Sequence, residues 1–249
     1  MKKWLLRIGI MILSLVFILF VGKLILEEPI PEGTPGKDAE LLASQMLKSI
    51  HKEAWDNTHW VTWSYKGARD FIWDRKRNYL KVDWKKNQVW LDLNDLKNSK
   101  VKVNGISTDG EEASPLIDKA WVYFCNDSFW LNAPAKIMDD GTKRSLVKLE
   151  GEKQGLLVTY SSGGVTPGDS YLWILDKNAR PLSFKMWVSL IPIGGIEASW
   201  EDWETTETEA VISRMHKIAF LELPILNLKT GNNLSTFNIP NDPFDVFNK

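Results

Sequence analysis

The sequence of 249 residues contains a single cysteine, Cys125, and only three histidines. One cysteine cannot form a disulfide within the chain, and it cannot build a cysteine-based metal site. His51, His59 and His216 show no ligand spacing such as H-E-x-x-H, so the sequence predicts no metal centre and no cofactor. Because Cys125 has no adjacent base, we interpret it as a small buried side chain rather than as a nucleophile.

A surplus of either charge is also lacking. The chain carries 31 basic and 32 acidic side chains, and no basic stripe is interleaved with aromatic residues. Nucleic-acid binding is therefore not expected. Apolar residues make up 44% of the chain, which is enough for a folded core and argues against disorder.

Sequence motifs of the common enzyme classes are lacking too. The chain has no G-x-S-x-G segment, and its glycine-rich stretch at 161–168 has no lysine to hold a phosphate. Acidic residues do cluster, and paired carboxylates about 5–10 Å apart across a cleft can act as acid and base. The cluster consists of Glu197, Glu201, Asp202, Glu204, Glu207 and Glu209. A solvated outer face is the favoured interpretation, so we predict a non-enzymatic protein, with a hydrolase acting through residues 197–209 as an alternative.

One long apolar run is present, at residues 8–26. It spans nineteen positions with Lys23 as the one charged side chain, and a helix of that length rises about 28 Å, enough to cross a bilayer core. Lys2, Lys3 and Arg7 precede the run, so the positive-inside rule places the N-terminus in the cytoplasm. A cleaved signal peptide is the alternative, but no small-x-small cleavage site follows the run. We predict a retained single-pass anchor at 1–26 in the inner (cytoplasmic) membrane, contacting the lipid bilayer through residues 8–26, and a periplasmic or other extracytoplasmic domain.

Beyond the anchor, the pattern predicts a Pro/Gly linker at 27–37, a β-rich domain at 38–221 and a C-terminal tail at 222–249, extended or packed on the domain. Apolar spacing predicts one helix at 39–52, and Ser114 followed by Pro115 predicts the start of another. Alternation in segments such as 79–84 and 88–93 predicts about ten short strands. The predicted fold is mainly β (α+β): a curved antiparallel sheet that forms an open or half-closed β-barrel with two covering helices.

The thirteen tryptophans are the compositional outlier. Strand alternation places large apolar side chains on one face, where they line either a packed core or a ligand cavity. The ligand-cavity candidates are Phe71, Trp73, Leu80, Val82, Trp84, Trp130 and Trp173. Trp90, Trp187 and Trp203 fall on the polar side of their strands and are candidates for surface contacts.

Two segments carry a resemblance to a known family. They are Phe129-Trp130-Leu131-Asn132-Ala133-Pro134 with the following Asp139-Asp140-Gly141, and the hairpin SYLWILDKNARPLSFKMW at 170–187. With the order of helices and strands, they resemble the LolA/LolB-like bacterial lipoprotein carriers. The resemblance implies a half-closed barrel with helices as a lid over an apolar cavity for acyl chains. Those carriers are soluble or anchored through a lipidated cysteine, whereas this chain has a predicted helical tether, and no functional residue of the family maps onto it.

The sequence therefore predicts a membrane-tethered envelope domain that binds a lipid, a lipoprotein acyl chain or another hydrophobic ligand. Apolar burial alone would supply the affinity of such a domain. The alternative is a protein-interaction or sensor module that contacts another envelope protein through exposed aromatic side chains.

Overall fold

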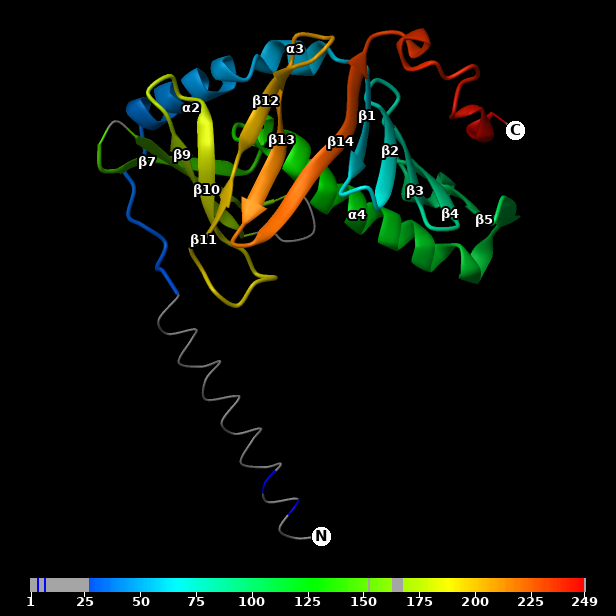
Figure 1. Cartoon of the computed structure of the whole chain (residues 1–249), viewed down its shortest axis with the longest axis horizontal. Helices are drawn as coiled ribbons and strands as arrows, with labels where there is room; N and C mark the ends of the chain where they lie inside the picture. Colours follow the sequence, from blue (N-terminus) through cyan, green and yellow to red (C-terminus); the bar gives the residue numbers. More distant parts are fainter. Residues whose placement is uncertain (1–3, 5–6, 8–26, 152, 163–167, 249) are drawn as a thin grey trace.

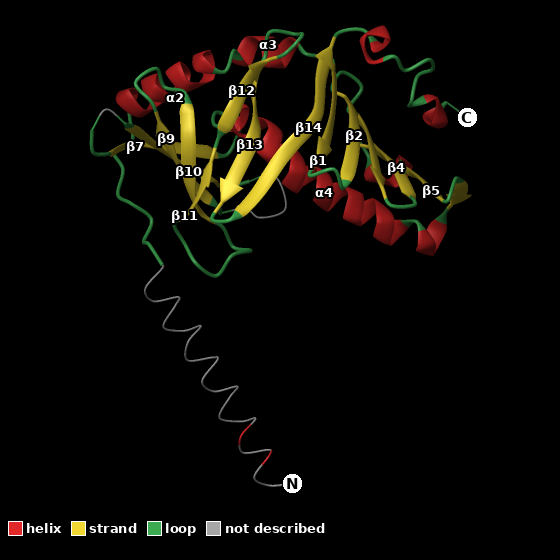
Figure 2. Ribbon diagram, viewed as in Figure 1, coloured by secondary structure: helices red, strands yellow, loops and turns green. Residues whose placement is uncertain are grey.

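The computed structural model describes residues 4, 7, 27–151, 153–162 and 168–248. In the described residues from 27 onward the fold is mainly β: fourteen strands form two antiparallel sheets, accompanied by three α-helices and short 3-10 turns (Figures 1 and 2). The sequence predicted this class, but it predicted fewer strands and a single sheet.

The larger sheet has nine strands. In spatial order they are β12 (Glu201–Thr205), β13 (Val211–Ile218), β14 (Leu221–Gly231), β1 (Trp60–Tyr65), β2 (Arg69–Asp74), β3 (Tyr79–Trp84), β4 (Asn87–Asp92), β5 (Lys100–Val103) and β6 (Ile106–Thr108). Strands β1–β6 form a meander of consecutive antiparallel neighbours. Because β14 pairs with β1, the C-terminal part of the chain lies beside its first strand.

The smaller sheet has five strands. In spatial order they are β11 (Ile196–Ser199), β10 (Pro181–Trp187), β9 (Ser170–Leu175), β8 (Gln154–Tyr160) and β7 (Thr142–Lys148). All four pairings join strands that follow one another in the chain. The predicted hairpin at 170–187 is β9–β10.

The two sheets meet at Trp200. Strands β11 and β12 are consecutive and separated only by this residue, yet β11 pairs with β10 and β12 pairs with β13. Across the junction, the Trp200 backbone N–H donates to the carbonyl of Leu182 at 2.8 Å, and that of Lys217 donates to Ser199 Oγ at 3.0 Å. The outermost described strands, β6 and β7, do not pair with each other. The predicted single sheet is thus corrected to two sheets joined at one edge, which do not close into a barrel.

All three helices pack on the face that both sheets turn toward the core. They are α2 (Lys37–Ser49), α3 (Lys52–Asn57) and α4 (Ser114–Asn132). The predicted helix at 39–52 is two helices because His51 adopts a left-handed backbone with φ 52° between them. Helix α4 begins at the predicted Ser114 and crosses the larger sheet (Figure 1). One hydrophobic core joins the helices to both sheets.

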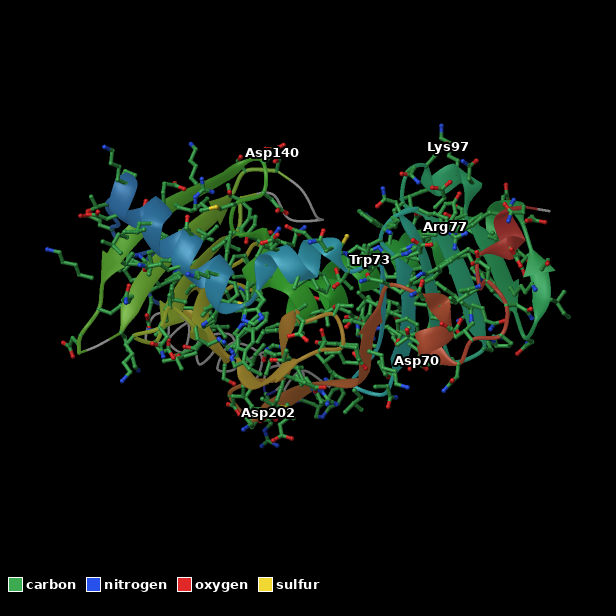
Figure 3. The ribbon with its side chains drawn as sticks, turned by 90° about the horizontal axis from the view of Figure 1, so that it is seen from above. Asp70, Trp73, Arg77, Lys97, Asp140 and Asp202 are labelled. Carbon is green, nitrogen blue, oxygen red and sulfur yellow. The ribbon has the colours of Figure 1, made fainter. Side chains whose placement is uncertain are left out.

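The segment predicted as a tail, 222–249, divides into two parts. Residues 221–231 form β14, in the interior of the larger sheet, and the segment after residue 231 covers the outer face of β1–β4. Phe237 and Phe244 of this segment are buried against Trp60 of β1 and Trp90 of β4. Arg77, labelled in Figure 3, holds this cover by donating to Asp242 at 2.7 and 2.9 Å and to Asp74 at 2.5 Å.

The predicted anchor run, 8–26, lies outside the described residues. In the part of the chain that is described, no helix combines the length and the apolar character needed to cross a membrane. The predicted linker at 27–37 contacts the smaller sheet. Thr34 and Leu146 exchange two backbone hydrogen bonds of 2.8 Å, and the Glu28 N–H donates to the carbonyl of Gly194 at 3.1 Å.

Candidate functional site

The first aromatic cluster lies between the larger sheet and α4. We define it as Trp63, Phe71, Trp73 and Phe124. Trp63 and Phe71 stack with ring centroids 4.4 Å apart and planes 6° from parallel. Phe124 of α4 meets Trp73 edge to face at 5.1 Å. The helix therefore packs directly on the aromatic side chains of β1 and β2.

The second aromatic cluster lies where the two sheets meet. We define it as Trp130, Trp173, Phe184 and Trp200, all buried. Trp173 lies 5.1 Å from Phe184 and 5.2 Å from Trp200, measured between ring centroids. Trp130, near the end of α4, lies 5.6 Å from Phe184. The second cluster thus joins the last turns of α4 to both sheets.

The seven ligand-cavity candidates all belong to this shared core. Six are buried, and Trp73 is partly exposed at its edge. The structure brings them together, but it packs them against α4, and their role as ligand contacts stays a prediction. Sequence reasoning missed Trp63, Phe124, Phe184 and Trp200. Trp63 lies at a register shift of β1, and Trp200 lies between β11 and β12, so strand alternation is interrupted at both.

Several donors inside this core have no hydrogen-bond acceptor among the residues that the structure describes. The indole N–H groups concerned belong to Trp63, Trp73, Trp173 and Trp200. The Tyr160 hydroxyl is likewise buried without a partner in the described part of the chain, and burial raises its pKa above the ordinary tyrosine value. A buried donor without an acceptor costs about 1–3 kcal/mol. The aromatic interior is therefore suited to receive hydrogen-bond acceptors.

An ion pair fastens the middle of α4 to the larger sheet. Asp127 is fully buried, and it accepts from Arg69 Nε at 2.5 Å and Arg69 Nη2 at 3.0 Å. Burial raises the pKa of Asp127, while the bond from Arg69 opposes the rise. The Arg69 guanidinium also stacks on the Tyr123 ring at 4.4 Å. We call the Arg69–Asp127 ion pair the fixed point of α4, because the other contacts of the helix in this region are mainly between aromatic rings.

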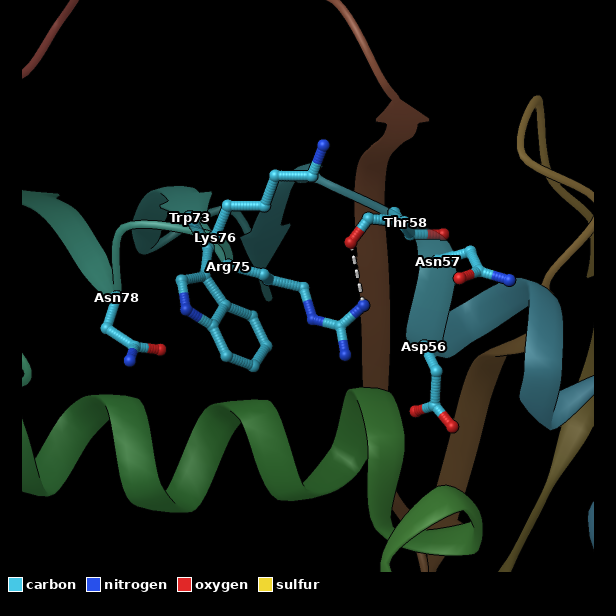
Figure 4. A pocket seen from close by; sticks show the side chains of 7 residues that line it. All are labelled: Asp56, Asn57, Thr58, Trp73, Arg75, Lys76 and Asn78. Carbon is cyan, nitrogen blue, oxygen red and sulfur yellow. Dashed lines mark hydrogen bonds between the residues drawn. The ribbon is translucent and has the colours of Figure 1, made fainter.

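A polar cavity of about 340 Å³ opens beside the first cluster (Figure 4). Arg75 projects along it, with its guanidinium 4.2 Å from the Trp55 ring centroid and 5.3 Å from that of Trp73. Its Nη1 donates to the carbonyls of Trp55 and Thr58, the latter at 2.9 Å. Burial lowers the pKa of Arg75 to about 10. Arg75 thus satisfies carbonyls at the end of α3, and this cavity is not the apolar chamber that the resemblance implied.

The three surface-contact candidates all bond within the chain. Trp90 is buried, and its indole donates to the carbonyl of Pro243 at 2.8 Å. Trp187 donates to the carbonyl of Glu28 at 2.7 Å, and Trp203 donates to that of Pro181 at 3.2 Å. Trp90 and Trp187 therefore contact segments that are far away in the sequence. These contacts explain why large aromatic side chains occur on the polar side of their strands.

The acidic cluster of 197–209 lies on β11, β12 and the following turn. Glu201 pairs with Lys217 at 2.8 Å, and Glu204 pairs with Arg214 at 2.6 Å. Lys217 lowers the pKa of Glu201. A catalytic acid needs the opposite shift, produced by burial or by a second carboxylate. The hydrolase alternative gains no support from these contacts. Within the described residues, no group of three or more His, Cys, Asp or Glu side chains could hold a metal ion.

No family model matches the chain, and no curated protein matches it either. The solved structures that resemble it include the following two. A DUF1329 family protein from Desulfovibrio piger has a TM-score of 0.43 and 10% identity, covering 80% of this chain and 95% of its own. A domain assigned to outer membrane lipoprotein sorting, from Vibrio parahaemolyticus, has a TM-score of 0.37 and 10% identity, covering 83% and 100%. The second assignment belongs to the class that the sequence layout resembles, but with TM-scores below 0.5 neither protein carries an argument about function.

Proposed function

We propose that this protein is a non-enzymatic binding domain of the cell envelope, tethered to the inner membrane, which holds a hydrophobic ligand between α4 and the aromatic face of the sheets. The observation that carries the proposal is an aromatic interior, packed against α4, with indole donors that have no partner among the described residues. An ordinary packed core hydrogen-bonds its buried donors.

The donors also indicate the ligand chemistry. Trp63 and Trp73 offer N–H groups within an apolar wall, so the complementary ligand combines apolar chains with acceptor oxygens. An acyl chain attached through an ester or amide carbonyl has both features. A lipid or the acyl chain of a lipoprotein therefore fits better than a hydrocarbon without oxygen.

The route for such a ligand is the first half of α4. Trp121 and Tyr123 are only half-buried there, whereas Trp130 and Leu131 near the helix end are buried. Tyr123 meets Trp84 edge to face at 5.5 Å, a contact that a ring or an acyl chain can replace. Separation of this half of the helix from β1–β4 would expose Trp63 and Trp73 while the second cluster stays closed.

The tether completes the proposal. Residues 8–26 cross the inner membrane with the N-terminus in the cytoplasm, and the domain lies on the periplasmic side. Such a domain receives or holds its ligand at the membrane rather than carrying it across the periplasm. Support for the tether comes from the sequence.

The test uses the full chain in phosphatidylcholine nanodiscs with two photoreactive probes of equal chain length, a monoacylglycerol ester and its ether analogue. We expect the ester to label peptides from β1–β2 and from α4 near Phe124, and the ether to label them more weakly. Trp63→Phe and Trp73→Phe keep an aromatic ring at each position but remove the indole N–H donor, so they should reduce the preference for the ester.

Trp187→Phe is the matched control, because Trp187 lies on the outer face and bonds to Glu28. It should leave the ester preference unchanged. Labelling restricted to residues 8–26 and the domain surface, equal for both probes, would contradict the ligand site. Release of the chain from membranes by alkaline carbonate would contradict the tether.

A further inference from the structure

The turn between β13 and β14 displays a large apolar side chain in solvent. Ile218 pairs with Leu221, which leaves Ala219 and Phe220 as a two-residue loop. The Phe220 side chain is 90% exposed, and Ala219 has φ 52°. Hairpin loops of this length normally use glycine, asparagine or aspartate at positive φ. Backbone strain at Ala219 and exposure of Phe220 would both destabilise a turn that contacts only water.

A second apolar tip lies at the same end of the fold. Leu190, in the loop between β10 and β11, is 74% exposed. Strand β11 begins at this loop and lies beside β13, where Lys217 bonds to Ser199. Because β13 runs antiparallel to the β11–β12 segment, the chain after Lys217 extends back toward the start of β11. Figure 1 shows the β10–β11 loop and the β13–β14 turn on the same side of the molecule.

The start of the described domain is fastened to this end. The Glu28 N–H bonds to the Gly194 carbonyl, and the Glu28 carbonyl accepts from the Trp187 indole. The Glu28 carboxylate pairs with Lys185 at 2.6 Å. A Cβ on Gly194 would come within 2.3 Å of Trp187, and one on Gly195 within 2.6 Å of Glu28, so both glycines permit this close approach. Residue 28 therefore has a fixed position beside the loop that carries Leu190.

We propose that the end of the fold that carries Leu190 and Phe220 docks on the surface of the bilayer that holds residues 8–26. The predicted anchor ends two residues before Glu28, so this end cannot lie far from the membrane boundary. Phe220 and Leu190 then enter the interfacial layer, where aromatic and apolar side chains are stabilised. The inference rests on the proposed tether but not on the proposed ligand.

Docking also determines which face of the bound domain stays in water. Helix α2 lies along the edge of the fold on the side away from the β10–β11 loop (Figure 1). Leu41 on α2 is 59% exposed and therefore stays in water. Two points of contact near residue 28 restrict rotation of the domain on its short linker, so the same face always meets the lipid.

The test measures the depth of spin labels on the full chain in phosphatidylcholine vesicles. Cys125→Ser removes the native thiol, and labels are placed through Phe220→Cys, Leu190→Cys and, as the matched control, Leu41→Cys. Labels at 220 and 190 should collide more with oxygen dissolved in lipid than with a water-soluble nickel chelate. The label at 41 should show the reverse.

Equal water accessibility at 220, 190 and 41, in a chain that alkaline carbonate does not extract, overturns docking and leaves the tether intact. A chain that carbonate extracts overturns the tether and removes the basis for docking. The ligand site is tested separately by photolabelling, so the three failures can be distinguished. All three label sites are on exposed side chains, and far-ultraviolet circular dichroism checks that each variant is folded.

Discussion

The two aromatic clusters differ in how α4 closes them. In the second cluster every ring is buried, and both sheets and the helix end contribute to it. In the first cluster Trp73 is partly exposed, and the helix residues beside it, Trp121 and Tyr123, are half-buried. The end of α4 and both sheets therefore enclose the second cluster together. The earlier part of α4 leaves the first cluster partly exposed.

This difference assigns separate roles to the two halves of the interior. The second cluster holds the two sheets together at Trp200, where a single residue separates strands of different sheets. Opening it would separate the sheets. In the proposed binding mode, only the first turns of α4 leave the first cluster, and the Arg69–Asp127 pair stays closed. That proposal predicts that binding and stability respond to different substitutions within one continuous core.

The largest expected contrast comes from truncating one ring in each cluster region. Phe184→Ala removes a fully buried ring that contacts three rings of the second cluster and should lower the free energy of unfolding by about 3–5 kcal/mol. Trp121→Ala in the half-buried part of α4 should cost about 1 kcal/mol. Denaturant unfolding followed by circular dichroism measures both. Equal costs would contradict the division of the core.

We expect acid to lower the free energy of unfolding through His216, which lies against Trp200 of the second cluster. His216 lies 4.3 Å from Trp200 between ring centroids, and burial lowers the pKa of His216 to about 4, against backbone bonds and the Glu201 charge that oppose the shift. Between pH 6.5 and 4 the unfolded chain binds a proton that the folded chain does not, so stability falls as the pH falls through that window. The loss should reach about 3 kcal/mol.

Denaturant midpoints at a series of pH values measure this loss. His216→Phe removes the titrating group and should flatten the curve between pH 6.5 and 4. The variant itself leaves the Ser199 carbonyl without the His216 partner, so only the pH slope is compared. An unchanged slope in the variant would contradict the assignment to His216.

The fixed point on α4 gives the smallest of the three effects on stability. Asp127→Asn leaves the Arg69 guanidinium without its carboxylate and should cost about 2 kcal/mol, below the usual range for a buried pair because Arg69 is partly exposed. The double variant Arg69→Met with Asp127→Leu should recover most of this loss. Denaturant unfolding of this double variant and of the single variants Arg69→Met and Asp127→Leu completes a double-mutant cycle and measures the coupling. An unchanged free energy of unfolding for Asp127→Asn would contradict the assignment of this pair as a fixed point of α4.

Alternation was sufficient to locate β3 and β4, predicted at 79–84 and 88–93, because their core-facing apolar residues recur at every second position. The start of α4 was predicted for a local reason as well, since Ser114 and Pro115 suit a helix N-terminus. Both signals act over a few residues, and the structure confirms both within one or two positions.

Strand β14 was not predicted, for identifiable reasons. Pro224 within it argues against an interior strand, and Asn227 has φ 52° at the irregularity in its pairing with β1. The break in register moves apolar residues off a simple period of two. Trp90 was assigned to the surface because it has polar parity, whereas the C-terminal segment covers it. Contacts between residues 153 positions apart leave no local signal.

By itself, the sequence determined local elements of this protein: the alternating strands, the start of α4 and the aromatic composition of the core. The anchor at 8–26 stays a prediction. Tertiary structure decided that the strands form two sheets joined at Trp200, that β14 lies beside β1, and that Glu28 lies against the β10–β11 loop. Periodicity reports which face of an element is buried, but it does not report which element buries it. That choice depends on the packing of side chains that are distant in the chain.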